Sequence, residues 1–89
     1  MEERREKLEK LVCEVIAEKK LWTLNQHVDR IVELAMKLKV PARKDCIQNF
    51  IAAYCVVAGL MRASEADQVA SSARGRRHWQ KKLSQLDPP

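Results

Sequence analysis

The stretch Phe50–Met61, Phe-Ile-Ala-Ala-Tyr-Cys-Val-Val-Ala-Gly-Leu-Met, decides the fold class of this chain. It is an unbroken apolar run in a sequence of which 33% is charged. At about 1.5 Å per residue a helix of this length spans roughly 18 Å, well short of the ~30 Å hydrocarbon core of a bilayer. The run therefore predicts the central buried helix of a small bundle rather than a membrane span. Its side chains offer no catalytic chemistry, so function must be sought in the charged residues around it.

Further helices are predicted on both sides of this run, because apolar residues recur there every three to four positions. Two glycines and three prolines leave little material for hairpins. The chain is therefore expected to be all-α, a compact bundle of four to five helices around a central helix over about 43–58. One domain is expected over 1–86, with 87–89 as a linker or the end of the expressed segment. The four expected helices cover about residues 3–20, 23–40, 43–58 and 64–83.

The expected helix ends rest on capping signals and on helix-breaking residues. The patterns Thr-x-x-Gln from Thr23 and Ser-x-x-Asp from Ser64 have the form of N-terminal capping boxes. Pro41 is expected to end the second helix, because the residue before a proline is pushed away from helical geometry. Gly59 suits a C-terminal cap. Gly75 costs about 1 kcal/mol in a helix interior, so the fourth helix is expected to break or fray there.

The cysteines and histidines do not predict catalysis. Cys13, Cys46 and Cys55 are odd in number and widely spaced, which favours a reducing compartment. Cys13 is expected near the surface, whereas Cys46 and Cys55 are expected to be core thiols. His27 is expected to be a half-buried packing residue. Neither zinc-ligand spacing nor a glycine-rich phosphate loop is present, so we expect no metal, no cofactor, no small-molecule substrate and no enzymatic activity.

The charges favour an anionic partner. The net charge is +5 and the pI is about 9.4, which suits nucleic acid, an acidic membrane or an acidic protein. The densest basic cluster has no acidic residue among its members and has Trp79 within it. It predicts either an anion-binding patch or simply a solvated helix face. Its members are Arg74, Arg76, Arg77, His78, Lys81 and Lys82.

A smaller basic cluster, Lys19 and Lys20, lies at the junction of the first two expected helices and is followed by Trp22. Helix C-termini attract cations through the helix dipole, which is enough to account for the two lysines. Trp22 is expected to pack under the turn. An exposed tryptophan beside the lysines would instead have the amphipathic character of an anchor at a lipid interface.

The order of these features resembles the retroviral Gag matrix domain, closest to the lentivirus type. The resemblance covers most of the chain in order and spacing. It lies in the elements Leu8-Glu9-Lys10-Leu11, Lys19-Lys20-Leu21-Trp22-Thr23-Leu24, Val28 with Glu33-Leu34, the central apolar helix Phe50–Leu60, and the small-residue helix turning basic over Ala66–Lys82.

The resemblance implies a structural protein of virion assembly that targets a Gag polyprotein to the cytoplasmic face of the host plasma membrane. Acidic lipid headgroups, phosphoinositides especially, would be bound by Lys19 and Lys20, with Lys7, Lys10 or Arg30 as neighbours. Such domains also bind RNA and often associate as trimers, so a homo-trimer or another homo-oligomer is implied.

The chain departs from that family at three positions. Glu2 stands where most members carry an acylated glycine, and Glu14 and Glu18 fall where the family tends to be cationic. Membrane binding would therefore depend on charge and on avidity from assembly. Two alternatives remain open: a nucleic-acid-binding helical module that uses the C-terminal basic cluster, and a protein-interaction adaptor whose stripe Trp79-Leu83-Leu86 docks a partner helix.

Overall fold

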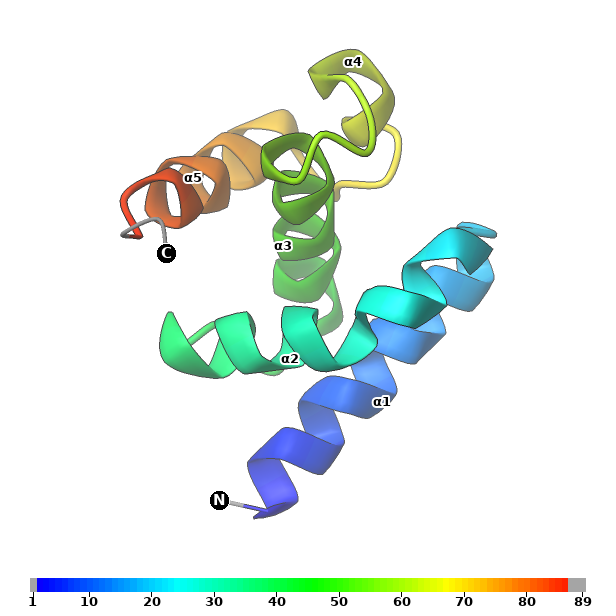
Figure 1. Ribbon diagram of the computed structural model, residues 1–89, viewed down its shortest axis with the longest axis vertical. Coiled ribbons are helices and arrows are strands. Elements are labelled where there is room, and N and C mark those ends of the chain that lie inside the picture. Colours follow the sequence, from blue (N-terminus) through cyan, green and yellow to red (C-terminus); the bar gives the residue numbers. More distant parts are fainter. Residues whose placement is uncertain (1, 87–89) are drawn as a thin grey trace. The chain divides into compact units, whose positions relative to one another are not determined.

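The computed structural model describes residues 2–86, and in that part of the chain five α-helices and one 3-10 helix form, with no strand. In chain order they are α1 (Glu2–Glu18), η1 (Trp22–His27), α2 (Val28–Lys37), α3 (Lys44–Val57), α4 (Ala63–Ala66) and α5 (Ala73–Ser84) (Figure 1). The all-α class is confirmed. Residues 87–89, the expected linker or end, lie outside the described residues.

The chain divides into two compact units, Met1–Ile47 and Gln48–Pro89, and the boundary falls inside α3. The first unit holds α1, η1, α2 and the first turn of α3. The second holds the rest of α3 together with α4 and α5. The expected single domain over 1–86 stays a prediction.

In the first unit α1 packs against η1 and α2 (Figure 1). The guanidinium of Arg4 donates to the carbonyl oxygen of Val40 at 2.9 Å, and Arg5 pairs with Asp29 at 3.6 Å, so the first turns of α1 are tied to the second half of the unit. The buried apolar side chains of this unit follow the helical periodicity. They are Leu8, Val12, Val15, Ile16, Leu24, Ile31, Val32, Leu34, Ala35, Val40 and Ile47.

The expected capping box at Thr23 is wrong. The 3-10 helix η1 begins at Trp22, with Leu21 in the N-cap position and without a side-chain cap, and α2 begins only at Val28. Because η1 runs directly into α2, no extended residue stands before α2 to act as a cap. The 3-10 turn instead buries Leu24.

Helices α1, α2 and α3 each end in a Schellman motif, with one residue in the left-handed region. That residue is Lys20 (φ 57°), Lys39 (φ 58°) and Gly59 (φ 72°), respectively. In each motif the next amide reaches back five residues, with N···O distances of 2.8, 2.9 and 2.8 Å. The expected glycine cap at Gly59 is confirmed.

The second helix ends earlier than predicted. Helix α2 stops at Lys37, and the Schellman turn at Lys39 has already redirected the chain before Pro41. Val40, the residue after the left-handed position, is fully buried. The end of α2 therefore coincides with the burial of Val40 in the core of the first unit. Pro41 comes after the turn and does not cause the helix to end.

The apolar run is buried only in part. Its first six residues, Phe50–Cys55, are all buried within α3. Val57 and Leu60, in contrast, are 46% and 45% exposed. The prediction of a central buried helix holds for the first half of the run and is wrong for the second, where α3 ends at Val57 and the chain turns at the surface.

The expected fourth helix over 64–83 is two helices. Helix α4 begins after Arg62, whose backbone N–H donates to Glu65 Oε1 at 3.1 Å, so the predicted cap at Ser64 is wrong. Helix α5 begins after Ser72, whose Oγ accepts from the N–H of Gly75 at 3.0 Å. Ser72 is therefore the N-cap that forms in this region.

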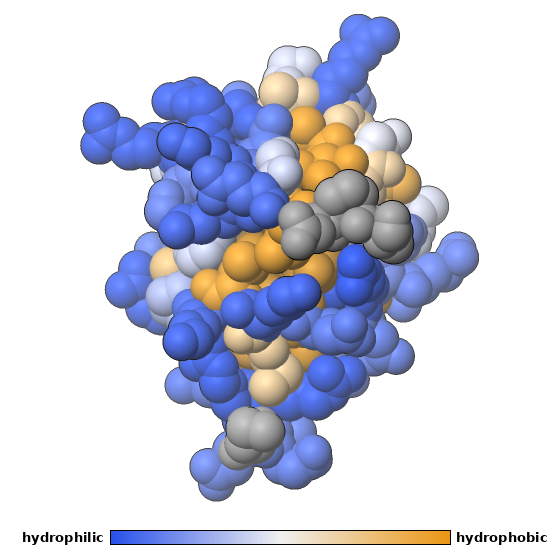
Figure 2. Space-filling model, turned by 60° about the vertical axis from the view of Figure 1, so that its left-hand side comes forward, coloured by the Kyte–Doolittle hydropathy of each residue, from blue (hydrophilic) through white to orange (hydrophobic). Residues whose placement is uncertain are grey.

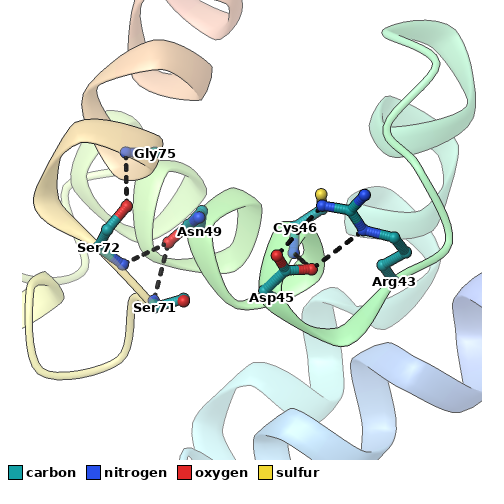
Figure 3. A network of polar contacts seen from close by, with 7 residues as sticks. All are labelled: Arg43, Asp45, Cys46, Asn49, Ser71, Ser72 and Gly75. Atoms are coloured by element: carbon teal, nitrogen blue, oxygen red, sulfur yellow. Dashed lines mark hydrogen bonds and ion pairs between the residues drawn. The ribbon is translucent and has the colours of Figure 1, made fainter.

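Gly75 is not a break, because it lies in the first turn of α5 where the helix crosses Asn49 of α3 (Figure 3). A Cβ at Gly75 would lie 2.2 Å from Nδ2 of Asn49. The Oδ1 atom of Asn49 accepts from the backbone N–H groups of Ser71 and Ser72 at 2.8 and 3.0 Å. Asn49 thus holds the start of α5. Position 75 suits glycine because the side chain of Asn49 comes so close to its backbone.

Candidate functional site: two basic surfaces

Hydrophilic side chains dominate the face of the molecule drawn in Figure 2, with apolar side chains visible in patches. Within residues 2–86, none of the helices combines the length and the apolar character that a membrane crossing requires. The same residues contain no group of three or more His, Cys, Asp or Glu side chains that could hold a metal ion. The basic residues that the sequence singles out lie on two surfaces.

The first surface lies where α1 meets η1, and we call Lys19, Lys20 and Trp22 the Lys-Trp junction. All three side chains are exposed, and Trp22 has 59% of its surface exposed. The expectation that Trp22 packs under the turn is wrong. In the described part of the chain neither lysine forms an ion pair, so both charges face solvent.

Local backbone geometry explains why Trp22 points outward. The N–H of Leu21 is bonded to the carbonyl of Ile16 at 2.8 Å in the Schellman turn, which fixes the chain as it enters η1. A 3-10 helix has three residues per turn, so neighbouring side chains point about 120° apart. Leu24 is the buried residue of η1, and Trp22 lies on a different face of it.

An ion pair neutralises one of the acids near the junction. Lys44 at the start of α3 pairs with Glu18 at the end of α1. Sequence reasoning missed Lys44, because a contact between residues 26 positions apart leaves no signal in local spacing. Glu14, one turn before Glu18, is exposed and has no ion pair among the described residues.

The other predicted lipid-binding residues are not gathered at the junction. Lys7 and Lys10 are exposed earlier on α1, and nine residues of helix place Lys10 roughly 13 Å from Lys19 along the axis. Arg30 is exposed on α2 and pairs with Glu33 at 3.5 Å. Of the five residues in this set, the structure brings only Lys19 and Lys20 together with Trp22.

Arg43 is also not a free cation. Its guanidinium donates to both carboxylate oxygens of Asp45 at 3.3 and 3.2 Å (Figure 3). These bonds, together with the N–H of Cys46 at 2.9 Å, hold the pKa of Asp45 below its usual value. The carboxylate therefore stays ionised at neutral pH and keeps Arg43 engaged.

The second surface is the cationic face of α5, which we define as Arg74, Arg77, His78, Lys81 and Lys82. All five side chains are exposed. At about 100° per residue they fall within an arc of about 140°. No ion pair involves them in the part of the chain that the structure describes. Their predicted position opposite Trp79 and Leu83 is confirmed.

Arg76 does not belong to this face, contrary to its predicted place in the basic cluster. Its side chain is buried, with a relative exposure of 5%, and it pairs with Asp67. Its Nη1 donates to Gln80 Oε1 at 2.6 Å. The sequence pattern hid this pairing, because Asp67 lies nine residues earlier and belongs to the turn after α4.

The apolar side of α5 is occupied by the fold itself. Trp79 packs edge to face on Phe50 of α3, with ring centroids 5.8 Å apart, and its other ring contact is His78 at 4.7 Å. Leu83 is buried, with 6% of its surface exposed. Trp79 and Leu83 are therefore engaged within the second unit, Leu86 is half-buried, and the adaptor alternative stays a prediction.

The three thiols are free and have different environments. Burial raises the pKa of Cys55 to about 11, and burial followed by the charge of Glu9 raises the pKa of the exposed Cys13. Burial also raises the pKa of Cys46, which is half-buried rather than in the core as predicted. All three shifts lower the thiolate fraction at neutral pH, which is the opposite of what an activated nucleophile needs.

Comparison of the chain with family models, with curated proteins and with solved structures returned no match. What the chain does must therefore be argued from its own two basic surfaces.

Proposed function

We propose that this chain is a non-enzymatic, matrix-like structural domain that binds acidic membrane lipids, phosphoinositides especially, through the Lys-Trp junction. The observation that carries the proposal is the exposure of Trp22 beside two lysines that form no ion pair within residues 2–86. A tryptophan ring has an apolar body and a polar N–H, and such rings settle at the level of lipid headgroups. Lysines beside it would meet the phosphates.

The Schellman turn holds the backbone of Lys20 in a strained conformation. This residue occupies a left-handed position (φ 57°) that glycine adopts at no steric cost. A non-glycine residue there costs about 1–2 kcal/mol. Lys39 occupies the same kind of position at the end of α2, so this cost belongs to the Schellman turn and does not by itself point to a ligand.

The binding energy expected from one copy is small. A basic residue near an acidic membrane surface contributes about 1 kcal/mol, so Lys19 and Lys20 together supply about 2 kcal/mol. Stable attachment would then need several copies bound at once, as in a homo-trimer or a larger assembly. The place of action consistent with this chemistry is the acidic cytoplasmic face of the plasma membrane.

The test is binding to vesicles of graded acidic-lipid and phosphoinositide content at low salt. The variant Lys19→Gln/Lys20→Gln is expected to lose about 2 kcal/mol, roughly 30-fold in the partition coefficient. The variant Lys37→Gln/Lys39→Gln removes the same net charge from another exposed part of the first unit and serves as the matched control. Equal losses in the two variants would overturn the proposal, as would no binding by the unaltered chain.

Trp22 provides a second readout. In the variant Trp79→Phe it is the only tryptophan, so its fluorescence reports the junction alone. Acidic vesicles are expected to shift its emission to shorter wavelength, because the ring leaves water for the headgroup region. Emission that stays unchanged while the chain sediments with vesicles would show that another surface carries the binding.

A further inference from the structure

Residues 68–86 contain five arginines and lysines, Arg76 included, and no aspartate or glutamate. The nearest preceding acid, Asp67, is held by Arg76. The cationic face of α5 therefore has no acid on its own helix to neutralise it. We propose that this face binds the phosphate backbone of double-stranded nucleic acid without sequence preference.

The geometry suits a dense line of negative charge. Arg74, Arg77, Lys81 and Lys82 are spread over roughly 12 Å of helix axis. Duplex DNA carries about one negative charge per 1.7 Å of its axis and releases condensed counterions when cations replace them. Four cations in one arc, none of them in an ion pair with another described residue, can contact several neighbouring phosphates at once.

The composition of this face favours nucleic acid over a lipid surface. Helices that lie on membranes bury an apolar face among the acyl chains. On α5 the large apolar side chains are Trp79 and Leu83, and both are engaged in the second unit or buried. The exposed arc offers only charged and polar groups, so it has nothing to insert.

The position of Trp79 favours duplex over single-stranded nucleic acid. Proteins that bind single strands stack exposed aromatic rings on the bases. Trp79 is half-buried and already packs on Phe50, and the helix carries no other tryptophan, tyrosine or phenylalanine. Contacts are therefore expected to go to phosphates, which carry no sequence information.

Arg76 acts here as a positioning residue. Its pair with Asp67, which lies outside the helix, fixes the rotation of α5 and so turns Arg74 and Arg77 outward, while its bond to Gln80 stays within the helix. Neighbouring arginines thus have separate roles. Loss of Arg77 should weaken binding, whereas loss of Arg76 should weaken the fold.

The experiment measures fluorescence anisotropy of a labelled 20-base-pair DNA duplex with the full chain between 50 and 200 mM salt. Four phosphate contacts predict a slope of about −3.6 in a plot of log K against log salt, and roughly a 100-fold loss of affinity over this range. A second duplex of unrelated sequence is expected to bind equally. An RNA duplex of the first sequence shows whether the face prefers DNA or RNA. Either preference supports the proposal, because both duplexes present a phosphate backbone.

Substitutions show whether the cationic face of α5 is the surface that binds the duplex. Arg74→Gln/Arg77→Gln/Lys81→Gln/Lys82→Gln is expected to abolish the salt dependence and most of the affinity, and Arg77→Gln alone to make the slope less steep by about 1. Lys19→Gln/Lys20→Gln, in the other unit, should leave the slope unchanged. Arg76→Gln should lower the melting temperature while keeping the slope when measured below that temperature.

One strand of the DNA duplex, measured alone, is the last probe. Three results would overturn the proposal: no binding of the unaltered chain to the duplex at 50 mM salt, unchanged duplex affinity of the fourfold variant, or tighter binding of the single strand than of the duplex. Loss of vesicle binding by the fourfold variant with duplex binding retained would assign the face to lipid instead. These outcomes are independent of the Lys-Trp junction, which has its own variants.

Discussion

Arg76 and Arg77 are neighbours in the sequence with opposite environments in the structure. Arg76 is buried and paired with Asp67, whereas Arg77 is exposed and has no ion pair in the described part of the chain. The guanidinium of Arg76 is buried whereas Asp67 still reaches water, so loss of Asp67 would be the costly change, because it leaves a buried charge unpaired. An exposed arginine contributes little to stability and remains available to a ligand.

Gly75 offers a sharp test of packing at the residue scale. In an ordinary helix interior Gly→Ala is stabilising by about 1 kcal/mol. Here the added methyl would lie 2.2 Å from Nδ2 and 2.6 Å from Cγ of Asn49, whose side chain is held by two backbone N–H groups. Gly75→Ala is therefore expected to destabilise by about 1–3 kcal/mol in chemical denaturation.

A double-mutant cycle separates this clash from other causes. In an Asn49→Ala background the obstructing side chain is absent, so Gly75→Ala should become neutral or stabilising. Two changes in contact are expected to be strongly non-additive. A higher melting temperature for Gly75→Ala in the unaltered background would contradict the geometry.

At the scale of elements, the three Schellman motifs differ in the residue at the left-handed position. Gly59 occupies it in α3, but lysines occupy it in α1 and α2. Each lysine there pays a steric cost of about 1–2 kcal/mol that glycine avoids. The motifs form nonetheless, because each supplies backbone bonds to carbonyls that the helix end would leave unpaired.

Lys39→Gly is therefore expected to stabilise the chain by about 0.5–1 kcal/mol, the lower steric cost being partly offset by the greater freedom of glycine in the unfolded state. Thermal or urea unfolding measures the change. Lys37→Gly removes the same charge from the last residue of α2 and should destabilise by up to about 1 kcal/mol. Equal effects of the two substitutions would show that charge rather than backbone conformation dominates.

At the scale of the whole molecule, a net charge of +5 is unevenly distributed. Several cations are used within the fold: Arg4 bonds the carbonyl of Val40, Lys44 pairs with Glu18, and Arg76 pairs with Asp67. What remains unpaired includes the Lys-Trp junction and the cationic face of α5. These two surfaces lie in different units of the chain.

Glu14 is expected to limit membrane affinity, because it is an exposed acid near the end of α1 that no described cation pairs with. Glu14→Gln should strengthen binding to acidic vesicles by about 1 kcal/mol, roughly fivefold. The increase should vanish at high salt, where screening weakens exposed charges. Glu6→Gln, earlier on the same helix, removes another exposed acid without an ion pair among the described residues and serves as the control. An equal gain in that variant would show that net charge alone sets the affinity.

The sequence by itself determined the all-α class, the approximate extent of α1 and α3, the cap at Gly59 and the amphipathic character of α5. These features depend on periodicity and on residues a few positions apart, which a linear pattern records. The capping boxes at Thr23 and Ser64 failed because a matching local pattern does not require the helix to start there. The helix over 64–83, expected to break or fray at Gly75, is instead interrupted between Ala66 and Ala73, and Ser72 caps its second part.

Only the tertiary structure decided the exposure of Trp22, the burial of Arg76, the pairing of Lys44 with Glu18 and the close approach of Gly75 to Asn49. Each depends on contacts or burial that the spacing of neighbouring residues does not encode. The apolar run Phe50–Met61 shows the same division. Its composition predicts a helix, but the packing of the chain buries its first half and leaves Val57 and Leu60 at the surface.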